Sequence, residues 1–163
     1  MKARIDLMRV NPGVLQAMLG LEREVRKAGF DRRLMHLVLM RASQINGCAA
    51  CLDMHSKDAR ADGETELRLY GLDAWRETPY YSDRERAALE LTEAVTLVAE
   101  THVPDEVYER VRTQFSEDEL MRLTLAIISI NGWNRLNIVA RTVPGNYVPG
   151  SLKQLHAEAG VSA

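Results

Sequence analysis

The chain has 163 residues, of which 46% are hydrophobic and 27% are charged, and its formal net charge at pH 7 is -2. These totals are typical of a globular protein, and we expect one domain across residues 1–163 with a substantial core. The sequence has no Lys/Arg run that could follow a nucleic-acid backbone, no apolar run as long as a membrane span, and no signal-peptide pattern at its start. We therefore expect neither nucleic-acid nor membrane partners, and a cytoplasmic location.

The first part of the chain predicts two helices. Asn11 and Pro12 form a helix start, with Asn11 as the cap and Pro12 in the first helical position, and apolar residues follow at helical spacing to about residue 28. Asp31 is the expected cap of a second helix, in which the apolar residues between 34 and 45 cover a broad surface. That breadth predicts burial on more than one side of the helix.

The centre of the chain predicts shorter helices separated by turns. A helix that starts at or near Cys48 and runs to about Ala61 is expected to stop at Asp62-Gly63, and a short helix follows over residues 64–70. Residues 71–81, which include a glycine and a proline, predict an irregular connection.

Two capping boxes mark helix starts in the second half of the chain. Ser82 with Glu85 opens one helix, which His102-Val103-Pro104 interrupts, and Ser116 with Glu119 opens another. Between them, we expect a short helix that ends near residue 115.

The longest apolar segment runs from Leu120 to Ala140. Because it is apolar on nearly all sides, we expect this helix to lie in the centre of the domain or in a subunit interface. Prolines and glycines predict irregular structure over residues 142–151, and the tail from Leu152 predicts a last short helix. No segment has the alternation of a β-strand, so the predicted fold class is all-α.

The two cysteines of the chain, Cys48 and Cys51, lie just after the breaker pair Asn46-Gly47, and His55 follows one turn later. On one helix these three side chains share a face. A helix N-terminus favours negative charge and lowers the pKa of a thiol, and a histidine beside it can accept the proton or, when charged, attract the thiolate. The stretch therefore predicts a dithiol equipped for thiol–disulfide chemistry.

Two other interpretations of the pair compete with this one. Cysteine is often simply a small buried hydrophobe. Two thiolates with His55, and with His36 from another helix, could also bind zinc. The sequence contains neither a second Cys-x-x-Cys nor a paired histidine motif, so we expect no metal and assign no cofactor.

Two segments resemble a known family. The stretch Ala42–Cys51 (Ala-Ser-Gln-Ile-Asn-Gly-Cys-Ala-Ala-Cys), with Met54-His55 after it, resembles the signature of AhpD-like proteins in the carboxymuconolactone decarboxylase family. The segment Ile130–Asn137 is similar to the second motif of that group. The resemblance implies an all-helical homo-oligomer, a trimer or hexamer, that acts as a peroxidase through its Cys-x-x-Cys pair.

The resemblance also implies roles for single residues. Cys51 would attack the peroxide and become a sulfenic acid, Cys48 would resolve it to a disulfide, and His55 would relay protons. Two positions depart from the best-studied pattern, because His36 stands where that pattern has a glutamate and Ala50 stands where it has a histidine.

Because of these two departures, the family pattern does not identify all of the residues that would relay protons. His36 could rebuild it, so we include His36 among the candidate catalytic residues. Glu90 or Glu93 could supply the missing carboxylate if their helix packs against Cys51, although such residues more often face solvent.

We therefore expect a thiol-dependent peroxidase that reduces hydroperoxides. The sequence has no nucleotide-binding fingerprint, so an external dithiol or a reductant protein would have to supply the electrons. One alternative is a thiol–disulfide oxidoreductase or redox interaction module without efficient peroxidase activity. The other is lactone decarboxylation, but family members with that activity do not depend on a Cys-x-x-Cys pair.

Overall fold

The structure is a computed structural model that describes residues 1–152, and of Met8 only the backbone. Its helices are α1 (Leu7–Val10), α2 (Pro12–Arg26), α3 (Arg32–Asn46), α4 (Ala49–Ala61), α5 (Glu66–Tyr70), the 3₁₀ helix η1 (Gly71–Glu77), α6 (Asp83–Thr96), α7 (Val98–Thr101), α8 (Asp105–Arg112) and α9 (Glu117–Ala140). No strand occurs in the described part of the chain, and the predicted all-α class is confirmed. The short helix expected after Leu152 lies outside the described residues.

The helix starts follow the caps that the sequence predicts. The side chain of Asn11 accepts hydrogen bonds from the backbone of the first turn of α2, and both capping boxes are complete, at Ser82 with Glu85 and at Ser116 with Glu119. Asp31 is the N-cap residue of α3, but its side chain makes no capping hydrogen bond. The predicted positions therefore hold throughout, and only the capping bond of Asp31 is absent.

The prediction of an irregular connection over residues 71–81 is wrong for its first part, which forms η1. Leu72 and Trp75 are both buried there, on either side of a kink at Ala74, where the backbone leaves helical values with φ -108° and ψ 32°. The indole nitrogen of Trp75 also donates to Glu93 in α6 at 2.8 Å. Packing between distant segments, which local sequence signals do not report, therefore orders this connection.

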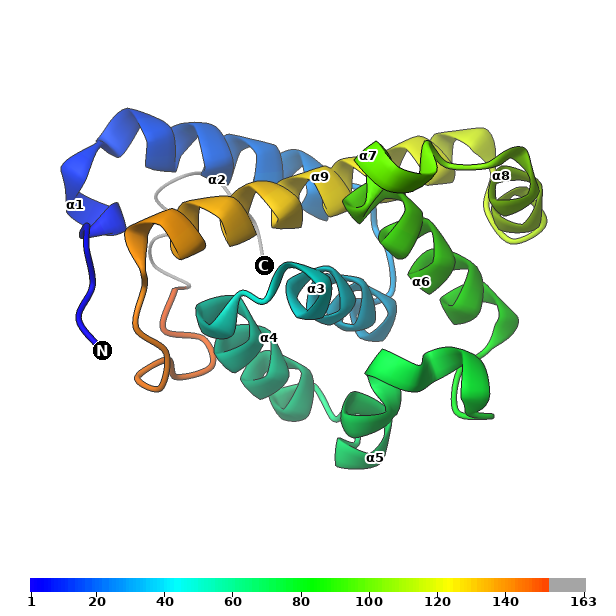
Figure 1. Cartoon of the computed structure of the whole chain (residues 1–163), viewed down its shortest axis with the longest axis horizontal. Helices are drawn as coiled ribbons and strands as arrows, with labels where there is room; N and C mark the ends of the chain where they lie inside the picture. The colour runs from blue at the N-terminus through cyan, green and yellow to red at the C-terminus, as the bar shows by residue number, and fades with distance from the viewer. Residues whose placement is uncertain (153–163) are drawn as a thin grey trace.

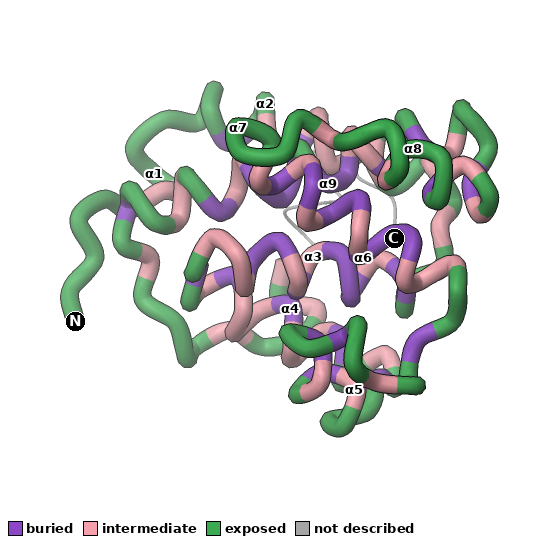
Figure 2. The backbone as a smooth tube through the Cα atoms, turned by 45° about the vertical axis from the view of Figure 1, so that its right-hand side comes forward, coloured by how far each residue is buried: buried purple, intermediate pink, exposed green. Residues whose placement is uncertain are grey.

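Two hydrophobic clusters flank α3 at the centre of the molecule (Figure 1). One joins α3 to α6, α8 and α9, and includes Leu34, Val38, Leu91, Val111, Phe115, Leu123 and Ile127. The other joins α3 to α4, α5, η1 and α6, and includes Leu37, Met40, Ala59, Leu69, Leu72, Trp75 and Leu89. The expected burial of this helix on more than one side is confirmed (Figure 2).

The long helix α9 packs against α2, α3 and α6, so its expected central position is confirmed. Along one edge of the molecule α2 runs beside it, held by a small cluster of Leu15, Leu19 and Trp133 (Figure 1). Some apolar side chains of α9 remain exposed, including Ile128 and Val139.

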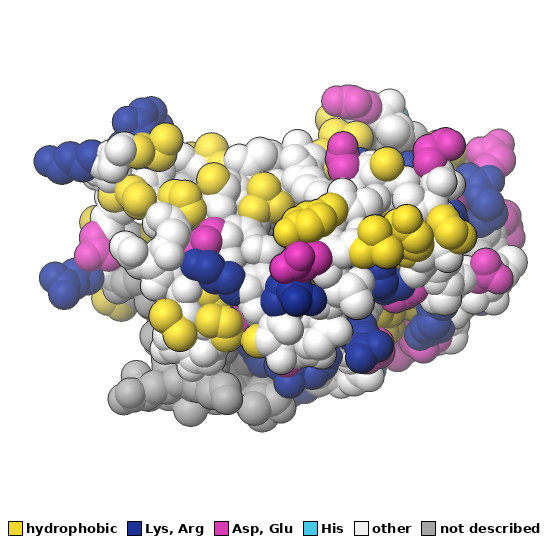
Figure 3. All heavy atoms as spheres, turned by 90° about the horizontal axis from the view of Figure 1, so that it is seen from below, with side chains coloured by type: hydrophobic (Ala, Val, Ile, Leu, Met, Phe, Trp, Pro, Cys, Tyr) yellow, Lys and Arg dark blue, Asp and Glu magenta, His cyan; other side chains and the backbone are white. Residues whose placement is uncertain are grey.

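One face of the molecule carries side chains of several types. On the face drawn in Figure 3, hydrophobic, basic and acidic side chains are interspersed. Within the described residues, no helix combines the length and apolar character that crossing a bilayer requires.

Candidate active site

A sharp reversal of the chain places the two cysteines at the start of α4. Gly47 ends α3 in the left-handed conformation, with φ 66° and ψ 33°, which glycine adopts without steric cost. Cys48 then takes the N-cap position of α4, and its backbone N–H donates to the carbonyl of Ser43 at 3.0 Å. Cys51 lies in the first turn of α4, so the predicted location of the pair at a helix N-terminus is confirmed.

Cys48 and Cys51 are joined by a disulfide, with their Cα atoms 5.4 Å apart. Each residue is only 1% exposed, so neither sulfur lies on the outer surface. The structure therefore represents the oxidised state of the pair.

A cavity of about 1530 Å³ reaches one of the two sulfur-bearing residues. It lies between α2, α3, α4 and α9, and residues 3–7 and 142–152 contribute to its wall. Much of its lining is apolar, including Leu15, Leu39 and Trp133. Of the two cysteines, Cys51 lines the cavity, and it is the residue that a small molecule in the cavity would meet.

The predicted histidines line the same cavity. His55 lies one turn after Cys51 on α4 and is buried. Burial, and to a smaller extent the charge of nearby His36, lowers the pKa of His55 to about 4. The imidazole of His55 is therefore neutral near pH 7.

His36 comes to this site from α3. Its Nε2 lies 2.6 Å from Oδ2 of Asp62, and Asp62 is also paired with Arg32 at 3.0 Å. Within residues 1–152, Nδ1 of His36 and Nε2 of His55 are buried and have no hydrogen-bond partner. Two imidazole nitrogens of cavity-lining residues are thus enclosed without a hydrogen-bond partner in the described part of the chain.

The segment over residues 142–151 is irregular, as predicted, and three side chains of α4 hold it. Lys57 donates to the carbonyls of Gly145 and Tyr147 at 3.1 and 3.0 Å, and the backbone N–H of Gly145 donates to Asp53 at 3.0 Å. The segment is thereby attached to the helix that carries Cys51.

The third of these side chains is Asp58, which accepts from the hydroxyl of Tyr147 with oxygen–oxygen distances of 2.8 and 3.0 Å. Burial raises the pKa of Asp58, and burial together with Asp58 raises the pKa of Tyr147 to about 12. Both residues line the cavity, so this hydrogen-bonded pair forms part of its wall.

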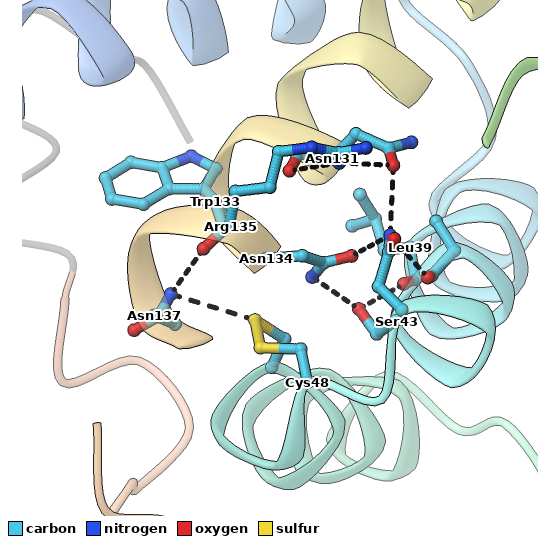
Figure 4. Close-up of a disulfide and its surroundings, with 11 residues drawn as sticks. Leu39, Ser43, Cys48, Asn131, Trp133, Asn134, Arg135 and Asn137 are labelled. Carbon is cyan, nitrogen blue, oxygen red and sulfur yellow. Dashed lines mark hydrogen bonds between the residues drawn. A yellow bond between two sulfur atoms is a disulfide. The ribbon is translucent and has the colours of Figure 1, made fainter. Parts of the chain in front are cut away.

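Asparagines of α9 hold the end of α3 in place, just before the cysteines (Figure 4). The amide of Asn46 donates to the side-chain oxygens of Asn131 and Asn134 at 2.9 and 2.8 Å. Asn134, which is fully buried, donates in turn to the hydroxyl of Ser43 at 3.1 Å. The second sequence motif therefore positions the turn that carries Cys48.

One residue of α9 contacts the disulfide itself. The amide of Asn137 donates to Sγ of Cys51 at 3.7 Å and to the carbonyl of Trp133 at 2.9 Å (Figure 4). No role for Asn137 was predicted from the sequence. The available signal was the three-residue spacing of Asn131, Asn134 and Asn137, which places them along one side of a helix.

The two glutamates considered for the relay are engaged elsewhere. Glu93 accepts hydrogen bonds from Nε of Arg41 and from Trp75, both at 2.8 Å, and also pairs with Arg76. Glu90 pairs with Arg110 at 2.7 Å.

Neither Glu90 nor Glu93 is among the residues that line the cavity. The described residues also contain no group of three or more His, Cys, Asp or Glu side chains arranged to hold a metal ion. Carboxylate groups reach the site instead from α4 and the residue after it, as Asp58 and Asp62.

Residues 12–94 match the sequence profile of the carboxymuconolactone decarboxylase family. The chain belongs to this family. The uncharacterized protein YdfG of Bacillus subtilis is 44% identical over 138 residues, which cover 85% of this chain and 94% of YdfG. The uncharacterized protein YnjA of Escherichia coli is 33% identical over 105 residues, which cover 64% of this chain and 57% of YnjA.

Solved structures of the same fold agree with this membership. A crystallised Agrobacterium tumefaciens protein of unknown function, described as a candidate AhpD antioxidant defence protein, is 41% identical, with a TM-score of 0.86. The match covers 90% of this chain and all of that one. The debrominase Bmp8, as a cysteine-to-alanine variant in complex with 2,3,4-tribromopyrrole, shares the fold at a TM-score of 0.72 and 18% identity, covering 93% of this chain and 78% of Bmp8. The AhpD-like resemblance inferred from sequence is confirmed.

Proposed function

We propose that this member of the family is a thiol-dependent peroxidase that reduces hydroperoxides through Cys48 and Cys51. Family membership and the paired cysteines support a redox role. The observation that carries the finer proposal is that Cys51 opens onto a large cavity beside two buried histidines.

In the first step the Cys51 thiolate attacks the terminal oxygen of the hydroperoxide. An S–O bond forms, the O–O bond breaks, and the leaving alkoxide takes up one proton to become the alcohol. Cys51 is thereby oxidised to a sulfenic acid while the peroxide is reduced by two electrons. Hydrogen peroxide would release water in the same step.

His55 is the group best placed to move the proton. It is neutral near pH 7, so it can take the proton of the Cys51 thiol and pass it to the leaving alkoxide. His36, held by Asp62, offers a second imidazole nitrogen at the same cavity. In this proposal His36 serves where relatives in the family have a glutamate.

In the second step the thiol of Cys48 attacks the sulfenic sulfur of Cys51, a disulfide forms, and one water molecule leaves. The product is the disulfide state that the structure contains. An external dithiol, either a small molecule or a reductant protein, then reduces the disulfide and is itself oxidised to a disulfide. The expected trimer or hexamer and the cytoplasmic location stay predictions.

The burial of both sulfurs bears on the alternatives. At 1% exposure, neither sulfur can meet a folded protein, whether a substrate or a reductant, without movement of the chain, whereas a small hydroperoxide or a small dithiol can approach Cys51 through the cavity. This favours the peroxidase over a general thiol–disulfide oxidoreductase or interaction module. Lactone decarboxylation stays the least supported option, because it gives the cysteine pair no role.

A single-turnover experiment tests the proposal. We expect that the reduced protein, mixed with a small excess of cumene hydroperoxide, loses two thiols per chain and forms the Cys48–Cys51 disulfide. Cys51→Ser should abolish the reaction, and Cys48→Ser should stop it at the sulfenic acid, which dimedone traps. Peroxide consumption by Cys51→Ser at the wild-type rate would overturn the assignment, and rapid exchange with a model disulfide but not with peroxide would favour the oxidoreductase.

A further inference from the structure

Asn137 makes a side-chain contact with the sulfur of Cys51. Its Nδ2 lies 3.7 Å from Sγ and 2.9 Å from the carbonyl oxygen of Trp133. A carboxamide nitrogen carries two hydrogens, so one can go to the carbonyl while the other goes to the sulfur. Among the hydrogen bonds found in the described part of the chain, this is the one that joins a side-chain donor to a cysteine sulfur.

A buried thiolate at Cys51 requires such a donor. Burial disfavours the charged form of a thiol, and Cys51 is 1% exposed. The N-terminus of α4 provides part of the compensation through its dipole and unpaired N–H groups.

The donor is also held in position before any reaction begins. Its second hydrogen bond fixes the carboxamide to the backbone of α9. On the same helix, Asn131 and Asn134 bind Asn46, one residue before the turn that leads to Cys48. The donor and the asparagines that hold the turn before Cys48 are thus carried by the same helix, α9 (Figure 4).

We propose that Asn137 is a catalytic residue of this site, whose amide N–H donates a hydrogen bond to the Cys51 thiolate and stabilises it for attack. No proton leaves Asn137 in this role. The amide holds the negative charge on sulfur until the attacking electron pair forms the new bond to oxygen. The inference rests on the proposed dithiol function, but it does not depend on which oxidant reacts.

The thiol pKa of Cys51 is the quantity to measure. In a reduced Cys48→Ser background, which leaves one thiol, the rate of alkylation by iodoacetamide as a function of pH reports that pKa. A hydrogen bond to a charged group is strong enough to change the ionisation about tenfold or more. We therefore expect Asn137→Leu to raise the pKa by about one unit and Asn137→Asp, which adds a negative charge, to raise it further.

Matched variants distinguish this role from a general loss of folded structure. Asn146 is exposed, and the same exchange there, Asn146→Leu, should leave the alkylation profile unchanged. Asn137→Ala removes the donor without adding a charge or bulk, so it decides the question if the leucine variant fails to fold. Circular dichroism and the melting temperature check the fold of each variant.

An unchanged thiol pKa in folded Asn137→Leu or Asn137→Ala would overturn the inference. The readout involves no peroxide, so it is independent of the peroxidase assay. If the single-turnover reaction fails but the pKa rises as expected, the peroxidase proposal falls and the role of Asn137 in thiolate stabilisation stands. If peroxide reacts but the pKa is unchanged, the peroxidase proposal stands and the role of Asn137 in thiolate stabilisation falls.

Discussion

His55 shows how burial sets the protonation state of a single residue. Its pKa is lowered from the ordinary 6.5 to about 4, mainly by burial, while the unfolded chain keeps the ordinary value. Between these values the unfolded state binds a proton that the folded state does not. The stabilising effect is therefore complete above pH 6.5, declines as the pH falls toward 4, and is lost below that.

We expect this titration to cost the folded protein about 3 kcal/mol of unfolding free energy between pH 7 and pH 4. His55→Gln should flatten that part of the profile, as measured by urea unfolding at closely spaced pH values. His102 is exposed and has a left-handed backbone that asparagine tolerates, so His102→Asn is the matched control and should keep the slope. A profile with the same slope in both variants would contradict the pKa of His55.

The site residues predictable from the sequence are those that share one helix. Cys51 and His55 are four residues apart, so helical geometry alone places them together. Other residues of the site come close to Cys51 and His55 in ways that a short spacing does not predict. Tertiary packing brings Asn137 and Tyr147 to the cavity, and Asp62 lies just beyond the end of α4. His36 was predicted only because a family pattern marks its position.

At the scale of elements, side-chain hydrogen bonds between α9 and the end of α3 support the turn that leads to the disulfide. Asn134 is fully buried and bonds both Asn46 and Ser43. Asn134→Ala would remove one hydrogen bond from each of these partners, while Asn46 keeps its bonds to Asn131 and Ala42 and Ser43 keeps its bond to Leu39, so we expect a loss of about 1 kcal/mol of unfolding free energy. We also expect faster reduction of the disulfide by dithiothreitol, because the turn before Cys48 loses its support.

Chemical unfolding and a thiol-release assay measure the two effects of Asn134→Ala. The exposed Asn146 again provides the control, and Asn146→Ala should change neither quantity. If Asn134→Ala lowers stability but leaves the reduction rate unchanged, the network stabilises the fold without controlling the disulfide.

The elements themselves were predicted where the signals are local. Capping residues and helical periodicity place the starts of α2, α6 and α9 correctly, since a cap acts within four residues of the backbone it satisfies. The 3₁₀ helix η1 escaped prediction because Leu72 and Trp75 pack against residues far away in the chain. Local sequence carries little information about such packing.

At the scale of the whole molecule, the proposed peroxidase would take its substrate through the cavity that Cys51 lines. Its volume of about 1530 Å³ is far larger than hydrogen peroxide needs, and much of its wall is apolar. In the proposed peroxidase we therefore expect a bulky organic hydroperoxide to gain binding energy from the wall that hydrogen peroxide cannot gain.

Leu15 offers a way to test this selection, because it lines the cavity from α2, a helix that carries none of the proposed catalytic residues. Leu15→Phe should reduce the space and slow the oxidation of Cys51 by cumene hydroperoxide several-fold more than that by hydrogen peroxide. Val14, its neighbour on α2, is 38% exposed, so Val14→Phe adds the same ring outside the cavity and should leave the ratio of the two rates unchanged. Equal slowing of both peroxides by Leu15→Phe would mean that the cavity does not discriminate by size, and that substrates reach Cys51 by another route.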